Sequence, residues 1–143
     1  MKTIGQLLHS KGNKIIAVAP DETVFNALTL MAQHNIGSVL VLEADKLVGI
    51  FSERDYARKV ALQGKASRDM PVSEVMTEKV YYVAPAITID EGMALMTDKH
   101  VRHLPVLGEG ATVIGIVSIG DLVKETISQQ EFIIKQLEAY ILS

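Results

Sequence analysis

Two copies of a Ser-x-x-Asp motif, Ser52 to Asp55 and Ser118 to Asp121, are the residues of this sequence whose spacing best suits ligand binding. In each copy a glycine and two apolar residues precede the serine, and the motif joins a β-like run to a helix-like run. The free N–H groups and the dipole of a helix start attract phosphate. An aspartate carboxylate can accept hydrogen bonds from both hydroxyls of a ribose. The motif therefore indicates a corner that could hold a nucleotide.

A structural alternative explains the same spacing. A serine or threonine at the N-cap with an acid three residues later forms a capping box, which satisfies free backbone N–H groups. Thr88 to Glu91 of this chain has the pattern of that device. Capping boxes prefer Glu or Gln at the third position, and Asp is short for reaching back, which favours a binding role for the two Ser-x-x-Asp copies. Both interpretations remain open from the sequence.

Basic residues accompany both motifs. Arg54 and Arg58 follow the first, and Arg102 with His103 opens the strand expected to pair with the second. Arginine suits bidentate phosphate binding. The counterpart of Arg102-His103 in the first half of the chain is Gly37-Ser38. We therefore expect two otherwise matched sites to differ in affinity.

Other chemistries find little support. His100 and His103 are three residues apart but have no convincing third ligand, so no metal site is expected. The chain has no cysteine, which excludes thiol catalysis and disulfides. It has no Gly-x-Ser-x-Gly elbow and no evident acid/base pair of carboxylates. We therefore expect no catalytic residues and no enzymatic activity.

An internal repeat organises the chain. The order strand-helix-strand-strand-helix occurs twice, with Pro20 matching Pro85 at a shift of 65 and Gly49 matching Gly115 at a shift of 66. We predict an α/β (α+β) fold in which two such repeats pack with pseudo-twofold symmetry, each too small to be stable alone. The expected divisions are a first repeat at 10–62, a linker at 63–79, a second repeat at 80–128 and a helical extension at 129–143. The strands are expected at 15–18, 38–43, 47–51, 80–83, 104–107 and 112–117, and the helices at 23–34, 53–62, 88–100 and from 119.

The two ends of the chain are expected to be helical. Residues 3–9 predict a short N-terminal helix. Apolar residues recur at helical spacing in the tail, which we expect either to cap the module or to pair with another subunit. The tail residues at this spacing are Phe132, Ile133, Gln136, Leu137, Tyr140 and Ile141.

Composition and charge limit the kinds of partner that the chain can have. The chain has 143 residues and a formal net charge of −3, with 48% hydrophobic and 22% charged residues. This charge argues against a nucleic-acid surface. No run approaches the roughly 18 apolar residues of a membrane helix, and the start lacks the apolar core of a signal peptide. We therefore expect a cytoplasmic protein with neither a nucleic-acid nor a membrane partner.

The doubled unit resembles a known family. Its Val18-Ala19-Pro20 start, its Arg102-His103-Leu104-Pro105-Val106 middle and its Gly115-to-Leu122 end are similar to those of a tandem pair of CBS domains, also called a Bateman module. The resemblance covers residues 10–128. It implies a regulatory module that binds an adenosine-containing ligand such as AMP, ADP, ATP, NAD or S-adenosylmethionine, that forms a homodimer and that acts on a protein target that the sequence does not name.

The resemblance also implies roles for individual residues. Asp55 and Asp121 would bind ribose. The phosphate would lie near Ser52, Arg54, Arg58, Arg102, His103 and Ser118. The adenine would lie near Ala17, Ile36, Gly37, Ser38, Met76, Tyr82, Val101 and Ile116. The chain departs from the family at Leu40, where a proline is usual.

Two other functions remain open. The clefts could be vestigial in an interaction module that works through its C-terminal helix. The phosphate-binding groups could also belong to a nucleotide hydrolase.

Overall fold

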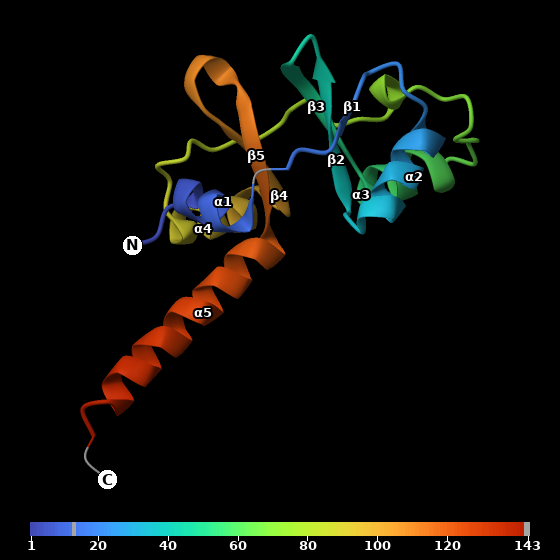
Figure 1. The fold of residues 1–143 in the computed structure, drawn as a ribbon. Helices are drawn as coiled ribbons and strands as arrows, with labels where there is room; N and C mark the ends of the chain where they lie inside the picture. Colours follow the sequence, from blue (N-terminus) through green and yellow to red (C-terminus); the bar gives the residue numbers. More distant parts are fainter. Residues whose placement is uncertain (13, 142–143) are drawn as a thin grey trace.

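The computed structural model describes residues 1–12 and 14–141 and shows the repeat directly (Figure 1). The first repeat comprises β1 (Ala17–Val18), α2 (Val24–His34), β2 (Ser38–Glu43), β3 (Lys46–Ser52), α3 (Glu53–Tyr56) and the π-helical turn η1 (Ala57–Ala61). The second comprises α4 (Ile89–Lys99), β4 (His103–Leu107), the 3₁₀ turn η3 (Glu109–Ala111), β5 (Val113–Ser118) and α5 (Ile119–Glu138). Helix α1 (Ile4–Lys11) precedes the first repeat, and the 3₁₀ turn η2 (Val72–Glu74) precedes the second. The predicted mixed fold of two repeats with flanking helices is confirmed.

The first repeat has a three-stranded sheet in the order β1-β2-β3. Strand β1 is parallel to β2, and β2 is antiparallel to β3. The β2–β3 hairpin closes through Ala44 and Asp45, whose φ angles of 50° and 65° lie in the left-handed region. Two consecutive residues with positive φ match the twist of the flanking strands.

The second repeat has only the antiparallel pair β4 and β5 in its sheet. The strand predicted at 80–83 is wrong, because the extended segment pairs only through Val83, which forms a parallel bridge with Val106. The reason lies at Pro105. In a parallel ladder the N–H of residue 105 would donate to the carbonyl of Tyr81, but proline has no N–H. The equivalent Leu40 does donate to Ile16 at 3.3 Å, and β1 forms there.

Each repeat packs against the segment that precedes the other repeat in the chain, here called its borrowed segment. Helix α1 packs in the core of the second repeat, where Ile4, Leu7 and Leu8 are buried with strand and helix residues that include Leu104 and Leu122. The segment that contains η2 packs instead on the first repeat, where Val72 and Val75 are buried. The two repeats therefore hold each other's leading segments, and neither core is complete without that exchange.

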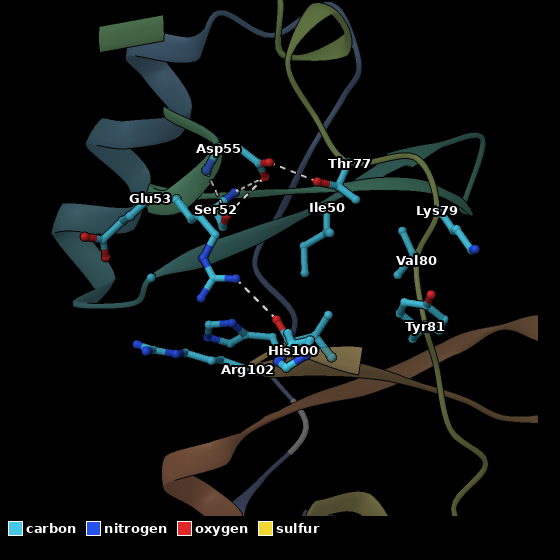
Figure 2. Close-up of a pocket in the computed structure, with 14 residues that line it drawn as sticks. Ile50, Ser52, Glu53, Asp55, Thr77, Lys79, Val80, Tyr81, His100 and Arg102 are labelled. Carbon is cyan, nitrogen blue, oxygen red and sulfur yellow. Dashed lines mark hydrogen bonds between the residues drawn. The ribbon is translucent and has the colours of Figure 1, made fainter. Parts of the chain in front are cut away.

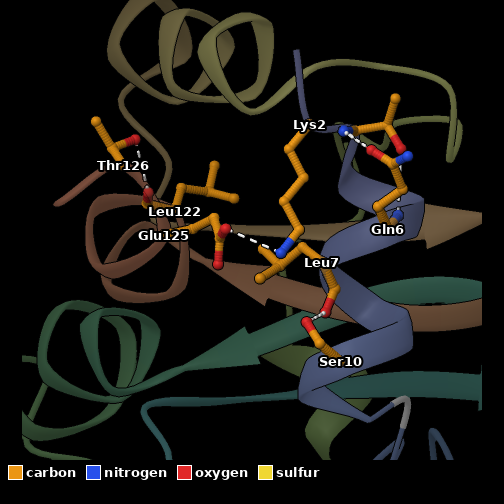
Figure 3. Close-up of polar contacts among 8 residues, drawn as sticks. Lys2, Gln6, Leu7, Ser10, Leu122, Glu125 and Thr126 are labelled. Atoms are coloured by element: carbon orange, nitrogen blue, oxygen red, sulfur yellow. Dashed lines mark hydrogen bonds and ion pairs between the residues drawn. The ribbon is translucent and has the colours of Figure 1, made fainter. Parts of the chain in front are cut away.

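Polar contacts join the segment of α1 to α5 and cap the N-terminus of α1 (Figure 3). The Nζ atom of Lys2 lies 2.9 Å from an Oε1 of Glu125 on α5. Thr3 and Gln6 form a capping box at the start of α1. The N-terminal segment therefore joins the second repeat through polar as well as apolar contacts.

The glycines that precede the two Ser-x-x-Asp motifs allow these segments to approach. A Cβ atom on Gly49 would lie 2.5 Å from the sulfur of Met76, and one on Gly115 would lie 2.8 Å from Leu8. Real Cβ contacts are not that short. A side chain at Gly49 or Gly115 would therefore displace Met76 or Leu8 from its packed position.

Helix α5 begins in the second repeat and continues far beyond it (Figure 1). Leu122 is fully buried, whereas every residue from 130 to 141 is exposed. The expectation that the tail caps the module is wrong for the part of it that the structure describes, which excludes residues 142 and 143. The tail prolongs α5 as a single helix away from the body. Among the described residues no helix has the length and apolar character needed to cross a membrane.

Candidate functional site

Both Ser-x-x-Asp motifs are capping boxes. The carboxylate Oδ2 of Asp55 accepts a hydrogen bond from the N–H of Ser52 at 3.0 Å, and that of Asp121 accepts one from the N–H of Ser118 at 2.8 Å. In return each serine hydroxyl accepts the N–H of its aspartate. The expectation that Asp is too short for this device is wrong, because an extended backbone at the serine brings its N–H close to the third residue. Capping uses one oxygen of each carboxylate, so the role of the other oxygen decides whether a ligand can bind.

The first motif lies in a cleft between the two repeats, here called cleft 1 (Figure 2). The cleft has a volume of about 330 Å³, which is within the range of small-molecule sites. Its walls come from the ends of β3 and α3, the segment after η2 and the loop that enters β4. The lining residues are Gly37, Ile50, Ser52, Glu53, Arg54, Asp55, Thr77, Lys79, Val80, Tyr81, His100, Val101, Arg102 and His103.

Asp55 is almost fully buried in cleft 1, with 7% of its surface exposed. Its Oδ1 atom accepts a hydrogen bond from the hydroxyl of Thr77 at 2.9 Å and lies 3.1 Å from the Nζ atom of Lys59 (Figure 2 shows the first contact). Buried carboxylates persist when they are paired in this way. Both oxygens of Asp55 therefore have partners within the protein.

The second motif lies in a larger cleft of about 540 Å³, here called cleft 2. Helix α5 begins at this cleft, and its other walls come from the end of α1, the segment before β1 and the end of α2. The lining residues are Lys11, Lys14, Ile16, His34, Asn35, Ile36, Gly37, Ser38, His103, Ile116, Ser118 and Asp121.

Asp121 is held by a lysine. The Nζ atom of Lys11 lies 2.9 Å from its Oδ2 atom and donates to the carbonyl of Ile116 at 2.8 Å. Burial alone would raise the pKa of Asp121, but hydrogen bonds from Lys11 and Ser118 and the positive charge of Lys11 outweigh it and lower the pKa below its usual value. Asp121 is therefore ionised at neutral pH and ready to accept hydrogen bonds.

The two clefts are related by the repeat. Three pairs of lining residues occupy equivalent positions, each 66 residues apart in the chain: Ile50 and Ile116, Asp55 and Asp121, and Thr77 and Lys11, of which Lys11 is the earlier. In both clefts the borrowed segment thus supplies the residue that pairs with the aspartate. That residue is a neutral hydroxyl in cleft 1 and a cation in cleft 2.

In each repeat one backbone hydrogen bond joins the residue before the hairpin to the first residue of the helix after it. The N–H of Glu53 donates to the carbonyl of Gly37 at 3.0 Å, and the N–H of Ile119 donates to that of Arg102 at 2.9 Å. Since these bonds use the first N–H of each helix, they fix the position of the capping boxes relative to β2 and β4.

His103 lines both clefts. Its pKa is lowered from the usual 6.5, chiefly by burial and further by the nearby charges of Lys11 and Arg102, while Asp121 and Glu53 act in the opposite direction. His103 is therefore neutral at pH 7. The two clefts share a wall, because Gly37 and His103 line both of them.

The structure brings most of the predicted binding residues to the clefts. Seven line cleft 1: Gly37, Ser52, Arg54, Asp55, Val101, Arg102 and His103. Seven line cleft 2: Ile36, Gly37, Ser38, His103, Ile116, Ser118 and Asp121. Their roles toward ribose, phosphate and adenine stay predictions, since these positions show only that the side chains meet at shared cavities.

Four predicted residues line neither cleft: Ala17, Arg58, Met76 and Tyr82. Successive side chains of an extended segment point to opposite sides, so Ile16 and Tyr81 occupy the places predicted for their neighbours. Met76 is directed at Gly49 instead.

The sequence interpretation missed the residues that the borrowed segments supply. Lys11, Lys14, Thr77 and Lys79 all line clefts but stand outside the predicted repeats or at their edges. One signal could have found Ile50, because it is the repeat equivalent of the predicted Ile116. The lysines carry no such signal, because only the exchange of leading segments places them near the aspartates.

A duplicated sheet-and-helix unit with paired clefts at the helix starts defines the class of this protein, a tandem CBS-domain pair. The family model described as CBS domain matches residues 6–62 and 72–128. The chain therefore belongs to the CBS-domain family, and the resemblance seen in the sequence is confirmed. Both matched ranges begin earlier than the predicted repeats at 10–62 and 80–128.

Relatives support the same assignment. The chain is 38% identical to the CBS domain-containing protein CBSX3, mitochondrial, of Arabidopsis thaliana, over 97% of this chain and 71% of the relative. A crystal structure of the CBS-domain protein NE2398 is 50% identical, with a TM-score of 0.84 over 88% of this chain and 98% of the other.

A third structure shares the fold alone. The CBS domain pair of protein MJ0100, solved with 5′-methylthioadenosine and S-adenosyl-L-methionine, is 22% identical with a TM-score of 0.79, over 90% of this chain and 98% of the other. The family match and these relatives identify the chain as a tandem CBS-domain pair.

Proposed function

We propose that this CBS pair is a sensor of an adenosine-containing nucleotide, in the class of AMP, ADP, ATP or NAD, and that it has no catalytic activity. The observation that carries the proposal is the duplicated aspartate. Asp55 and Asp121 occupy equivalent places at the starts of α3 and α5, and each lines a cleft of suitable volume. A carboxylate placed there can accept the two hydroxyls of a ribose.

Charge near the aspartates supports a phosphate on the ligand. Cleft 1 contains Arg54, Lys79 and Arg102, and cleft 2 contains Lys11 and Lys14. Helix α5 also begins at cleft 2, and the dipole at the start of a helix favours a nearby anion. A nucleotide would therefore find phosphate partners in each cavity. Among the described residues Oδ1 of Asp121 has no partner and can accept a ribose hydroxyl directly, whereas Asp55 would have to exchange its contact with Thr77 or Lys59 for one.

The lack of catalysis follows from the same side chains. The serine hydroxyls accept backbone N–H groups within the capping boxes. The base beside the hydroxyl of Ser52 is Asp55, whose Oδ2 accepts that hydroxyl at 3.0 Å and whose Oδ1 is held by Thr77 and Lys59. Such an arrangement recognises a ligand but does not activate a nucleophile. Incubation with ATP and magnesium followed by product analysis tests this, and steady release of ADP or AMP would support the hydrolase instead.

Isothermal titration calorimetry with AMP, ATP and NAD tests the sensor. We expect binding of at least one of them at or below millimolar concentration. Heat changes that stay at the level of dilution for all three nucleotides, together with no adenosine compound in the purified protein by mass spectrometry, would overturn the proposal and support the interaction module.

We further propose that the protein is a homodimer joined by its α5 helices. Four exposed apolar residues of α5 fit the alternating four- and three-residue spacing of a coiled coil when Gln130 is counted between them: Val123, Ile127, Ile134 and Leu137. Their exposed fractions range from 42% to 61%. A stripe with this spacing fits another helix with the same spacing.

A second copy supplies such a helix. The only polar residue at these heptad positions is Gln130, and a polar residue there can fix register between two copies. The tail carries both Lys and Glu, which does not favour an anionic membrane as the partner.

Analytical ultracentrifugation of the full chain and of Ile134→Asp tests the dimer. We expect a dimer for the unchanged chain and a monomer for the variant, because a carboxylate in the helix interface would be buried without a partner. Glu131→Asp, a change on the same helix outside the apolar stripe, should leave the dimer intact. A monomeric unchanged chain, or a dimeric Ile134→Asp variant, would contradict the proposal.

A further inference from the structure

We propose that Lys11 makes cleft 2 selective for phosphate-bearing nucleotides over nucleosides, because it must leave Asp121 when a ribose binds there. The proposal rests on the proposed nucleotide function and assigns a specificity-determining role to a residue outside the two Ser-x-x-Asp motifs. It begins with the contact that the structure shows. The Nζ atom of Lys11 lies 2.9 Å from Oδ2 of Asp121, and this same carboxylate is the proposed ribose acceptor.

A ribose and Lys11 compete for that carboxylate. Oδ2 of Asp121 accepts the N–H of Ser118 at 2.8 Å and is also the oxygen that Lys11 contacts, whereas Oδ1 has no hydrogen-bond or ion-pair partner among the described residues. A ribose that places one hydroxyl on each oxygen therefore needs the position on Oδ2 that Lys11 holds. A neutral nucleoside that takes this position leaves the ammonium group of Lys11 without its counter-ion. A nucleotide supplies a phosphate in its place, and the lysine exchanges one anion for another.

The chain allows Lys11 to make this exchange. Lys11 is the last residue of α1, and the next residue, Gly12, has a φ of 93° that ends the helix. The side chain of Lys11 is 35% exposed, so it can turn from Asp121 toward the cleft without unpacking the core. Its neighbour Lys14 lines the same cleft and forms no ion pair with any other described residue.

Cleft 1 does not have this device. At the position equivalent to Lys11, Thr77 donates a neutral hydroxyl to Asp55. The lysine that contacts Asp55 is Lys59 on η1, which does not line cleft 1, whereas Lys11 lines cleft 2. We therefore expect the selectivity in cleft 2 only.

A buried hydroxyl gives independent evidence that cleft 2 receives a ligand. Ser38 is 4% exposed and lines the cleft, yet its Oγ atom has no hydrogen-bond partner among the described residues. Buried polar atoms in proteins nearly always have a partner. A ligand that fills the cleft can supply it, and the same hydroxyl is absent from the equivalent position in cleft 1, which is His103.

Titration of AMP and adenosine into the full chain and into Lys11→Met tests the proposal. Both are measured in an Asp55→Asn background, so that the remaining binding reports cleft 2. We expect the parent to prefer AMP by about tenfold to a hundredfold, the range of one charge-assisted hydrogen bond. Lys11→Met should bind AMP more weakly and adenosine more tightly, which reduces the preference to about threefold or less.

Controls separate this role from a structural one. Lys11→Arg keeps the charge and should keep the preference, and Lys46→Met, a change at the exposed start of β3, should leave both affinities unchanged. Equal weakening of AMP and adenosine in Lys11→Met, or an unchanged ratio, overturns the role of Lys11 while the sensor stands. Failure of the unsubstituted chain to bind either compound overturns the sensor and this proposal with it.

Discussion

Replacing Asp121 by asparagine should separate ligand binding from folding in cleft 2. Asparagine retains a carbonyl oxygen for the N–H of Ser118, so the capping box persists in weakened form. The lost ion pair with Lys11 is worth about 0.2–1 kcal/mol, because both side chains are partly exposed at 35% and 26%. We therefore expect the free energy of unfolding to fall by about 1 kcal/mol at most.

The expected loss of binding is larger. Hydrogen bonds to a charged group contribute about 1.5–3 kcal/mol and those to a neutral group about 0.5–1.5 kcal/mol, so each ribose hydroxyl loses about 1–1.5 kcal/mol. Two hydroxyls lose about 2–3 kcal/mol, which corresponds to roughly 30- to 150-fold in the dissociation constant. A nucleotide bound in cleft 2 should therefore dissociate much more readily from the Asp121→Asn variant.

Calorimetry with AMP and urea unfolding measure the two effects. Asp45→Asn is a matched control, since Asp45 lies in the β2–β3 turn with a φ of 65°, a backbone that asparagine also accepts. An AMP affinity of Asp121→Asn within twofold of the parent would refute the assignment of Asp121 to ribose. A loss of several kcal/mol of stability would instead show that the aspartate is needed mainly for folding.

Three further predictions follow from the same contacts. Asp55→Asn should cost more stability than Asp121→Asn, about 2 kcal/mol, because Asp55 is 7% exposed and also holds the hydroxyl of Thr77; equal urea midpoints for the two variants would contradict this. Leu8→Ala should cost about 2–5 kcal/mol and lower the melting temperature, because α1 belongs to the second core; a loss under 1 kcal/mol would show that α1 docks weakly. The free energy of unfolding should fall as the pH drops below about 6.5, since the unfolded chain takes up a proton that buried His103 resists, and His103→Gln should flatten that slope between pH 7 and 5.

The lowered pKa of Asp121 adds to the acid sensitivity at lower pH. The folded state keeps this carboxylate ionised below its usual value of 3.8, so the stability that the carboxylate contributes is present above that pH and is lost as the pH falls further. The two groups can thus be told apart by the pH at which stability declines.

Much of the fold could be predicted from the sequence because its signals are local and occur twice. Helical spacing and capping residues located α2, α4 and the start of α5, and β-branched runs located β2, β3 and β5. Asp55 and Asp121 could be predicted as a pair because they occupy equivalent positions in the two repeats. Where a prediction needed only a period or a cap, the structure agrees with it.

The missing strand at 80–83 shows where local signals fail. The sequence there has strong β propensity, but a ladder also needs donors on the partner strand. Pro105 lacks the N–H that would pair with Tyr81, whereas Leu40 supplies it to Ile16 in the first repeat. The first repeat has Leu40 where the family usually has a proline, and it is in this repeat that the first strand, β1, forms.

The sequence by itself determined the duplication, the positions of Asp55 and Asp121 and the family. Only the tertiary structure decided what faces those aspartates, because Lys11 and Thr77 reach them through the exchange of leading segments between the repeats. No spacing within a repeat encodes a contact between residues 11 and 121, since packing of α1 on the second core creates it. That packing brings a cation to the aspartate of cleft 2 and a neutral hydroxyl to the aspartate of cleft 1, whose lysine, Lys59, comes from its own repeat.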